Sequence, residues 1–438
     1  MTPHGSGGGS APRDAAAGPS AVPGGATASG SAADGDAEGN TSTPLLHPAD
    51  GLPEVVRDAD GLAATAAALA AGSGPVAVDA ERASGFRYSQ RAYLVQLRRA
   101  GSGTALVDPI PLGGDLTGLA PALDGPEWVL HAASQDLPCL AEAGLRPARL
   151  FDTELAGRLA GLPRVGLGPL TERMLGLTLE KGHGAADWSR RPLPEDWLVY
   201  AALDVEVLVE LRDALAALLE EQGKLEWALE EFEAVRTAGP PLPRADPWRR
   251  TSGIHKVRKP RALAAVRALW EARDRLAAER DVAPGRVLPD SAIVEAAVAS
   301  PASPKALSQL PVFRGRAQRR LESYWFGALR SAQTLPDAEL PRPAAATDGP
   351  PPVSRWADRD PAAAARLSAA RAGLAELSER WSVPVENLLQ PDLLRRLCWS
   401  PPDDGDVPGF LERGGARNWQ IALTAPVLEK ALSPRQEP

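Results

Sequence analysis

The pattern of apolar and polar residues changes along the chain from short runs typical of strands to longer periodic segments typical of helices. The apolar run that begins at Val76 predicts a first strand, and the alternating segment Tyr93 to Leu97 predicts a second. Small residues at 100–103 predict a turn, and residues 104–107 return as a third strand. Three consecutive strands with short connections predict a three-stranded meander.

Further strands and helices complete this part of the chain. Residues 128–131 predict a buried strand, and Ser134 is expected to cap the helix that follows it. A short strand at 150–153 leads into another helix, and after Leu167 almost every segment has helical periodicity. Strands followed by helices around a mixed sheet predict an α/β domain at residues 44–237.

The helices of this domain have recognisable boundaries. Asp58 or Asp60 is placed to cap an Ala-rich helix that runs through Ala70. Two long helices are predicted at 195–222 and 225–236, after a polar loop at 181–194.

Segments rich in proline and small residues divide the chain into domains. Residues 1–43 contain almost no large apolar side chain, so they cannot bury enough surface to offset the entropy of ordering and are expected to be a disordered tail. Two helical modules follow the α/β domain, and the second repeats the order of elements of the first, which indicates a diverged internal duplicate. The predicted division is a tail at 1–43, an α/β domain at 44–237, a linker at 238–253, an all-α module at 254–335, a Pro-rich linker at 336–360 and a second all-α module at 361–435.

The charge of the chain is unevenly distributed. The formal net charge is -8, yet the segment from Arg249 to Arg330 holds 17 lysines and arginines against 7 aspartates and glutamates. A basic module inside an acidic chain favours a nucleic-acid partner over a merely solvated surface.

Cysteine usage and the lack of long apolar runs bear on the compartment. Cys139 and Cys398 stand far apart, without His or Cys neighbours at ligand spacing, which argues against a zinc site or a disulfide framework and suits a reducing cytoplasm. No apolar run approaches ~18 residues and no signal pattern opens the chain, so neither a membrane span nor a secretion signal is expected. A monomer is the default expectation.

The first candidate metal-binding residues lie at the end of the first predicted strand. Asp79 and Glu81 are two positions apart and therefore project from the same face of the strand, where their like charges require a cation. The preferred cation is a divalent ion with oxygen ligands, although a D-x-E at a strand end is also typical of a solvated loop edge. Asp136 follows the buried strand at 128–131, and on its own it is equally a carboxylate that favours a helix N-terminus.

A tyrosine and a fourth carboxylate share one helix face further on. Tyr200 and Asp204 are at i and i+4 of the helix predicted at 195–222, and alone they are unremarkable surface residues. Together the four carboxylates and the phenol fit phosphoryl chemistry, in which two divalent ions about 4 Å apart stabilise the attacking and leaving oxygens and another group orients the water.

These residues carry a resemblance to a known family. Asp79-x-Glu81, the run from His131 to Asp136, and Tyr200-x-x-x-Asp204 resemble the three exonuclease motifs of the DEDD superfamily, in its tyrosine-bearing branch. The loop from Asp187 to Leu193 is similar to the stretch before the last motif in the ribonuclease D family, whose members carry helicase-and-RNase-D C-terminal (HRDC) domains after the catalytic domain. The resemblance implies a ribonuclease-H-like mixed α/β exonuclease domain followed by two HRDC-like helical modules.

The resemblance also implies roles for the matching positions. Asp79, Glu81 and Asp204 would bind the first of two Mg²⁺ or Mn²⁺ ions, and Asp79 and Asp136 would support the second. Tyr200 would orient the attacking water rather than act as a base, because a phenol with a pKa of about 10 is a poor base at neutral pH. Ala80 stands where relatives often have threonine, which removes a hydroxyl near the ligands but no ligand.

Several other residues are candidates for contact with substrate, each with an ordinary structural alternative. Asp152 is expected to cap the helix after it or to support the ligands. The candidates for binding RNA are Gln96, His131, Gln135, Lys181, His183, Lys256, Arg258, Lys259 and Arg316.

The sequence thus predicts a metal-dependent 3′-5′ exoribonuclease that acts on single-stranded RNA 3′ ends and releases nucleotides. Trimming of tRNA precursors or other stable RNAs is implied by the resemblance. Two alternatives stay open at this point, namely the same chemistry on DNA and an RNA-binding scaffold without catalysis.

Overall fold

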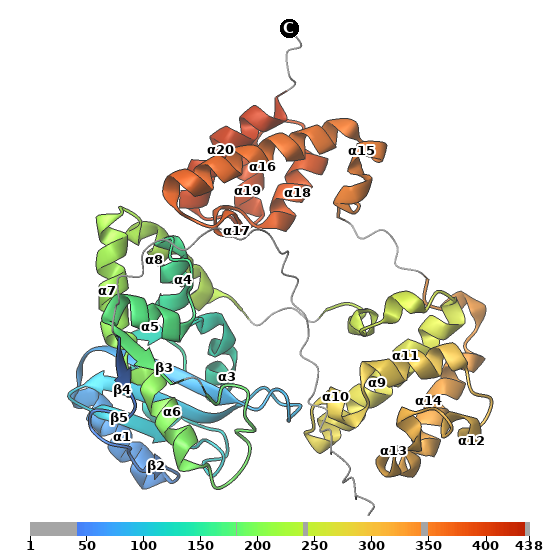
Figure 1. Cartoon of the computed structure of the whole chain (residues 1–438), viewed down its shortest axis with the longest axis horizontal. Helices are drawn as coiled ribbons and strands as arrows, with labels where there is room; N and C mark the ends of the chain where they lie inside the picture. Colours follow the sequence, from blue (N-terminus) through green and yellow to red (C-terminus); the bar gives the residue numbers. More distant parts are fainter. Residues whose placement is uncertain (1–41, 181, 240–243, 343–348, 434–438) are drawn as a thin grey trace, which may run out of the picture. The chain divides into compact units, whose positions relative to one another are not determined.

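The structure is a computed structural model that describes residues 42–180, 182–239, 244–342 and 349–433 (Figure 1). The tail predicted at 1–43 falls almost wholly outside the described residues, as does Lys181. Within the described residues the chain forms one part with a β-sheet and two parts made of helices, and each is considered by itself.

The first part is built on a mixed six-stranded sheet with the strand order β2-β5-β4-β3-β6-β7. The predicted meander is present, because β3 pairs antiparallel with β4, and β4 with β5. The other three pairings, β2 with β5, β3 with β6 and β6 with β7, are parallel. The strands are β2 (Val55–Val56), β3 (Ser73–Arg82), β4 (Ala92–Ala100), β5 (Gly103–Val107), β6 (Glu127–Leu130) and β7 (Arg149–Asp152).

The alternation of side chains along β3 assigns its two faces. Val76 and Val78 are fully buried in one core, together with residues of the helices that precede and follow the meander. Ala77 faces the opposite core, and the period of two places Asp79 and Glu81 on this same face. The carboxylates are therefore directed toward helices and not toward solvent beyond the sheet edge.

Different helices cover the two faces of the sheet. Helices α6 and α7 contact β3, and α4 and α8 contact β7. Residues of α1, α2 and α3 belong to the core on the opposite face. The helices of this part are α1 (Ala59–Ala71), α2 (Ala120–Leu123), α3 (Leu137–Glu142), α4 (Thr153–Leu159), α5 (Leu167–Leu175), α6 (Glu195–Glu206), α7 (Leu208–Glu221) and α8 (Leu225–Thr237).

Several local predictions are confirmed and others are wrong. Asp58 caps α1 by accepting a hydrogen bond from the Gly61 amide at 2.8 Å. Ser134 caps no helix, because residues 133–135 form a single 3-10 turn and α3 begins at Leu137. The helix predicted at 195–222 is divided at Val207 into α6 and α7.

A second, two-stranded sheet was not expected from the helical periodicity after Leu167. Strand β1 (Thr43–Leu45) pairs in parallel with β8 (Leu177–Leu179), which follows α5 directly. Each strand has only three residues, so neither carries an alternation long enough to be recognised in the sequence.

The second part of the chain is entirely helical, as predicted. Its core contains Trp325, Phe313 and Leu269, all of which are buried. The 3-10 turn Pro247–Arg250 lies in the segment predicted as linker, but its Trp248 is buried in this core. The α-helices of this part are α9 (Pro260–Arg280), α10 (Pro284–Val287), α11 (Asp290–Ala299), α12 (Pro304–Leu307), α13 (Arg316–Arg320) and α14 (Glu322–Thr334).

The third part is also helical. The predicted Pro-rich linker extends too far, because residues 353–359 form a 3-10 turn and α15, whose Trp356 is fully buried. The α-helices are α15 (Trp356–Arg359), α16 (Pro361–Trp381), α17 (Val385–Leu388), α18 (Pro391–Trp399), α19 (Val407–Arg413) and α20 (Asn418–Leu432). No helix among the described residues combines the length and apolar character that crossing a membrane requires.

Candidate active site

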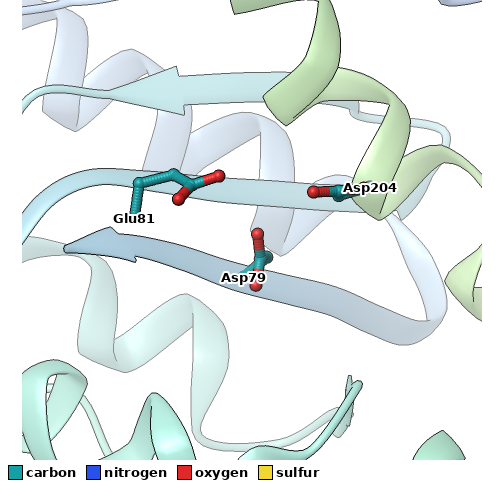
Figure 2. Close-up of side chains that lie close together, drawn as sticks. All are labelled: Asp79, Glu81 and Asp204. Atoms are coloured by element: carbon teal, nitrogen blue, oxygen red, sulfur yellow. The ribbon is translucent and has the colours of Figure 1, made fainter. Parts of the chain in front are cut away.

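Three carboxylates from two elements meet at the end of β3. Asp79 and Glu81 come from this strand and Asp204 from α6, and one oxygen of each lies within 4.8 Å of the others. Figure 2 shows the strand and the helix side by side, with the three carboxyl groups directed toward one another. The spacing suits ligands that share one cation, since all donors are the hard oxygens preferred by Mg²⁺ and Mn²⁺.

The electrostatics of the cluster also suit the binding of a cation. Burial, with the charges of Asp79 and Asp204 added to it, raises the pKa of Glu81 to about 10. Burial likewise raises the pKa of Asp79 to about 6 and the pKa of Asp204 well above its ordinary value. Ionising all three carboxylates without a bound cation therefore has a high free-energy cost. A divalent metal ion would offset this cost, so the residues present fit such an ion.

Asp136 lies beside this cluster and is paired with an arginine. The side chain is 6% exposed, and burial followed by the charge of Asp79 raises its pKa. Arg82, the residue after Glu81, approaches Asp136 with 3.5 Å between Nη2 and Oδ1. The arginine offsets part of the negative charge at the position where the second metal ion is expected.

A buried aspartate from the next strand shapes the turn that presents Asp136. Asp152, at the end of β7, accepts hydrogen bonds from the amides of Ala132 at 3.0 Å and Ala133 at 2.8 Å. It also accepts from the first amides of α4 and so caps that helix, as predicted. Ala132 has a left-handed backbone with φ of 58°, which these bonds hold in place. The helix cap expected of Asp152 is confirmed, whereas its other bonds go to the backbone of the turn before Asp136 and not to a proposed ligand.

Tyr200 lies one helical turn before Asp204, and a glycine-containing loop covers its ring. A Cβ atom on Gly182 would lie 3.4 Å from the ring, and one on Gly184 would lie 3.5 Å from the hydroxyl. Burial, followed by the charges of Asp204 and Glu81, raises the pKa of the phenol further above its ordinary value. The phenol is therefore a hydrogen-bond donor at neutral pH and not a base.

Arg191 fixes the loop between β8 and α6 to the sheet. Its guanidinium forms a two-point ion pair with Asp108, at 2.6 and 2.7 Å, and Asp108 is 1% exposed. The remaining N–H groups donate to the carbonyls of Tyr93, Trp188 and Arg190 at 2.7 Å. All five donors of the guanidinium are thus used. Sequence reasoning missed this anchor because Asp108 and Tyr93, which join the loop to the sheet, are distant from Arg191 in the chain.

A pocket of about 760 Å³ opens above the carboxylates. His131 and Gln135, two of the predicted substrate-binding residues, line it. His131 also contacts the Thr153 hydroxyl through Nδ1 at 2.9 Å, and burial lowers its pKa to about 4, so the imidazole is neutral. Arg164, which the sequence did not single out, lines the pocket as well.

Two other predicted substrate-binding residues of this part, Gln96 and His183, do not line the pocket. Gln96 is fully buried on β4 opposite Asp79, so it lies beneath the cluster, and a direct contact with RNA there is contradicted. Its side-chain nitrogen and oxygen have no partner among the described residues. His183 faces Asp196 at 3.5 Å, and Lys181 lies outside the described residues.

The predicted basic residues of the second part are exposed. Lys256 ends a 3-10 turn, Lys259 precedes α9 and Arg316 begins α13. Arg258 is exposed between the first two. Their contact with nucleic acid stays a prediction.

Family models match three segments of the chain. A model described as 3'-5' exonuclease matches residues 53–220, one described as HRDC domain matches residues 262–326, and one described as 3' to 5' exonuclease C-terminal domain matches residues 349–432. The two helical parts are thus matched by different models.

Named relatives and solved structures show the same similarity. The chain is 34% identical to ribonuclease D of Gluconacetobacter diazotrophicus over 337 residues, which cover 75% of this chain and 82% of that protein. A solved protein from Bifidobacterium adolescentis is 40% identical with a TM-score of 0.84, covering 89% of this chain and 99% of that one. Escherichia coli RNase D, described as an exoribonuclease involved in structured RNA processing, is 26% identical with a TM-score of 0.63, covering 86% and 98%.

Proposed function

Because this chain belongs to the ribonuclease D family and is a 3′-5′ exoribonuclease, we propose that the carboxylate cluster between β3 and α6 is its catalytic centre. The centre consists of Asp79, Glu81, Asp136, Tyr200 and Asp204. The observation that carries this assignment is the convergence of Asp79, Glu81 and Asp204, whose oxygens lie within 4.8 Å of one another.

The five residues divide between holding metal and positioning water. Asp79, Glu81 and Asp204 would hold one divalent ion, and Asp79 with Asp136 would hold a second. When bound, the ions would polarise the scissile phosphate and supply an activated water. Both Mg²⁺ and Mn²⁺ suit these oxygen ligands.

Tyr200 contributes by donating a hydrogen bond. Its raised pKa keeps the proton on the phenol throughout the neutral range, so the hydroxyl orients the attacking oxygen without removing its proton. The loop that covers the ring at Gly182 and Gly184 limits the directions in which the hydroxyl can point.

We propose a single-stranded RNA 3′ end as substrate and a nucleotide as product. The pocket of about 760 Å³ is within the size range of sites that enclose small organic ligands. Structured RNAs are the proposed physiological substrates, by analogy with the Escherichia coli relative. Precursors of tRNA are proposed among them because the family resemblance implies this. The exposed basic residues Lys256, Arg258, Lys259 and Arg316 would guide the RNA, and the two helical parts would act as HRDC-like RNA-binding modules.

The free, buried thiols of Cys139 and Cys398 support a reducing compartment, and we propose the cytoplasm. A monomer is the default proposal for the oligomeric state.

The test is release of nucleotides from 3′-labelled single-stranded RNA and DNA by the full-length protein with Mg²⁺ or Mn²⁺. Asp204→Asn and Tyr200→Phe should each lower the rate by roughly 10²-fold, because each removes one group that stabilises or orients the reacting atoms. Asp213→Asn is the matched control, since Asp213 is exposed on α7 and does not line the pocket.

Equal rates for Asp204→Asn and the wild type would contradict the assignment of the centre. Faster release from DNA than from RNA would contradict the proposed substrate and favour the DNA alternative.

A further inference from the structure

The pocket above the carboxylates has an unbalanced charge. Six acids line it, namely Asp79, Glu81, Asp136, Glu172, Glu180 and Asp204. Arg164 is the one arginine or lysine among its described lining residues, and His131 is neutral because burial lowers its pKa to about 4. Among the described lining residues, Arg164 is therefore the protein cation that a polyanion in this pocket would meet, in addition to any bound metal.

The backbone on both sides of Arg164 is fixed. The residue lies in the connection from α4 to α5, where the Leu162 amide donates to the Gly157 carbonyl at 3.0 Å. After it, the Leu170 amide donates to the Gly166 carbonyl at 3.0 Å. Val165, the next residue, packs close to Gly157, where an added Cβ would lie 3.3 Å from its methyl group. The side chain of Arg164 thus starts from a defined position at the pocket.

The guanidinium of Arg164 is not engaged by an acid. Among the ion pairs and side-chain hydrogen bonds of the described residues none involves Arg164, whereas Arg158 on α4 is paired with Glu154 at 2.6 Å and Arg82 with Asp136 at 3.5 Å. Arg164 also lies beyond ion-pair distance of Asp79, Glu81, Asp136 and Asp204, so these acids leave its charge available to a ligand in the pocket.

The covalent structure of an RNA 3′ end limits which phosphate group Arg164 could bind. The terminal nucleotide of RNA carries a hydroxyl at its 3′ side and the scissile phosphate at its 5′ side. Any second phosphate in the pocket must therefore belong to a nucleotide upstream of the scissile bond. A guanidinium matches a phosphodiester in charge and in hydrogen-bond geometry.

We propose that Arg164 forms a binding subsite for the phosphodiester immediately upstream of the scissile one, an inference that rests on the proposed function of the carboxylate centre. The contact holds the penultimate nucleotide and so sets the register of the 3′ end over the carboxylates. It acts on substrate binding and takes no part in bond cleavage.

The experiment measures release of the terminal nucleotide by the full-length enzyme from short RNAs, each with one neutral methylphosphonate linkage at a defined position. On the all-phosphate RNA, Arg164→Ala should raise KM roughly tenfold with kcat nearly unchanged, since a charged hydrogen bond is lost. On the RNA whose neutral linkage lies immediately upstream of the scissile bond, wild type and Arg164→Ala should have the same KM. On RNAs whose neutral linkage lies at another position, Arg164→Ala should still have a KM about tenfold above that of the wild type.

A binding measurement gives a second readout. Fluorescence anisotropy with labelled RNA in the Asp204→Asn background should show that Arg164→Ala lowers the slope of log affinity against log salt by about 0.7, the value expected for one phosphate contact to a single strand. Arg173→Ala is the matched control, because Arg173 is an exposed arginine on α5 that does not line the pocket.

Two results would overturn the subsite. One is an Arg164→Ala enzyme with the KM and salt dependence of the wild type. The other is a KM penalty that persists on every singly neutralised RNA, which would mean that Arg164 acts through the structure of the loop. Failure of the wild type to release any nucleotide would instead refute the proposed function, so the two failures are distinguishable.

Discussion

At the scale of single residues, ionising the carboxylates of the proposed centre without metal opposes folding. Glu81 is 7% exposed and faces Asp79 and Asp204, and its pKa of about 10 reflects burial first and their charges second. Ligand residues selected for binding divalent ions are therefore a source of instability in the metal-free protein.

The metal-free protein should lose stability as pH rises. The folded-state pKa of Asp79 is about 6 and that of Glu81 about 10, both above their unfolded values, so the folded protein binds protons more tightly. The stabilising contribution of the protonated groups is complete below the ordinary carboxyl pKa and is lost as pH rises through these folded values. In EDTA the free energy of unfolding should fall by roughly 1–3 kcal/mol between about pH 5 and about pH 8.

Saturating Mg²⁺ should flatten this dependence, and Asp204→Asn should reduce it, because both relieve the repulsion at Glu81. Denaturant unfolding at a series of pH values in EDTA and in Mg²⁺ provides the measurement. A metal-free protein whose stability is constant or rises over this interval would refute the expectation.

At the scale of elements, the site depends on how loops and strands are fixed to the sheet. The loop before α6 carries Gly182 and Gly184 against the Tyr200 ring and is fixed at its other end by Arg191 and Asp108. This ion pair joins the loop to the end of β5, two strands away from the carboxylates of β3.

Arg191→Lys should therefore impair Tyr200 without removing a positive charge. Lysine cannot form the two-point pair with Asp108 or reach three carbonyls, so we expect a loss of about 1–3 kcal/mol in stability and a lower kcat. Affinity for Mg²⁺, measured by calorimetry, should stay close to that of the wild type because the carboxylates are untouched.

Arg190→Lys serves as the control, since the Arg190 side chain is exposed and forms no ion pair among the described residues. A variant Arg191→Lys with full kcat and stability would show that the loop does not need this anchor.

At this scale the sequence could predict contacts between residues close in the chain, but not contacts between residues far apart in it. The pairing of Asp79 with Glu81 and of Tyr200 with Asp204 depends on the period of a strand and of a helix, which are local. The anchor of Arg191 is a long-range contact and has no signal in the loop itself. Ser134 failed as a cap for the same reason, because Asp152 supplies the hydrogen bonds that fix this turn from another strand.

At the scale of the whole molecule, charge is separated between parts of the chain. The pocket is lined by acids, whereas the segment from Arg249 to Arg330 has a large excess of basic residues. Binding of RNA and cleavage of its 3′ end would then depend on different parts of the protein.

Reversing the charges of the second part should weaken binding more than chemistry. The triple substitution of Lys256, Arg258 and Lys259 by glutamate should lower RNA affinity at least tenfold and reduce its salt dependence, with kcat on a short RNA little changed. Anisotropy over a range of salt concentrations and single-turnover rates measure the two effects.

The charge-matched control replaces three exposed arginines of the first part by glutamate, namely Arg57, Arg146 and Arg173, none of which lines the pocket. Equal losses of affinity in both triple variants would indicate an effect of net charge alone and would contradict a specific role for residues 256–259.

The four hydrogen bonds of Asp152 have a consequence for how relatives are judged. Asp152 shapes the turn that presents Asp136, yet it lies outside all three motifs that mark this type of exonuclease. A homologue that keeps every motif residue but has lost this aspartate by drift could be an inactive pseudoenzyme. A search for the motif residues alone would classify it as active. The position of Asp152 is therefore a useful additional criterion for separating working members of the family from degenerate copies.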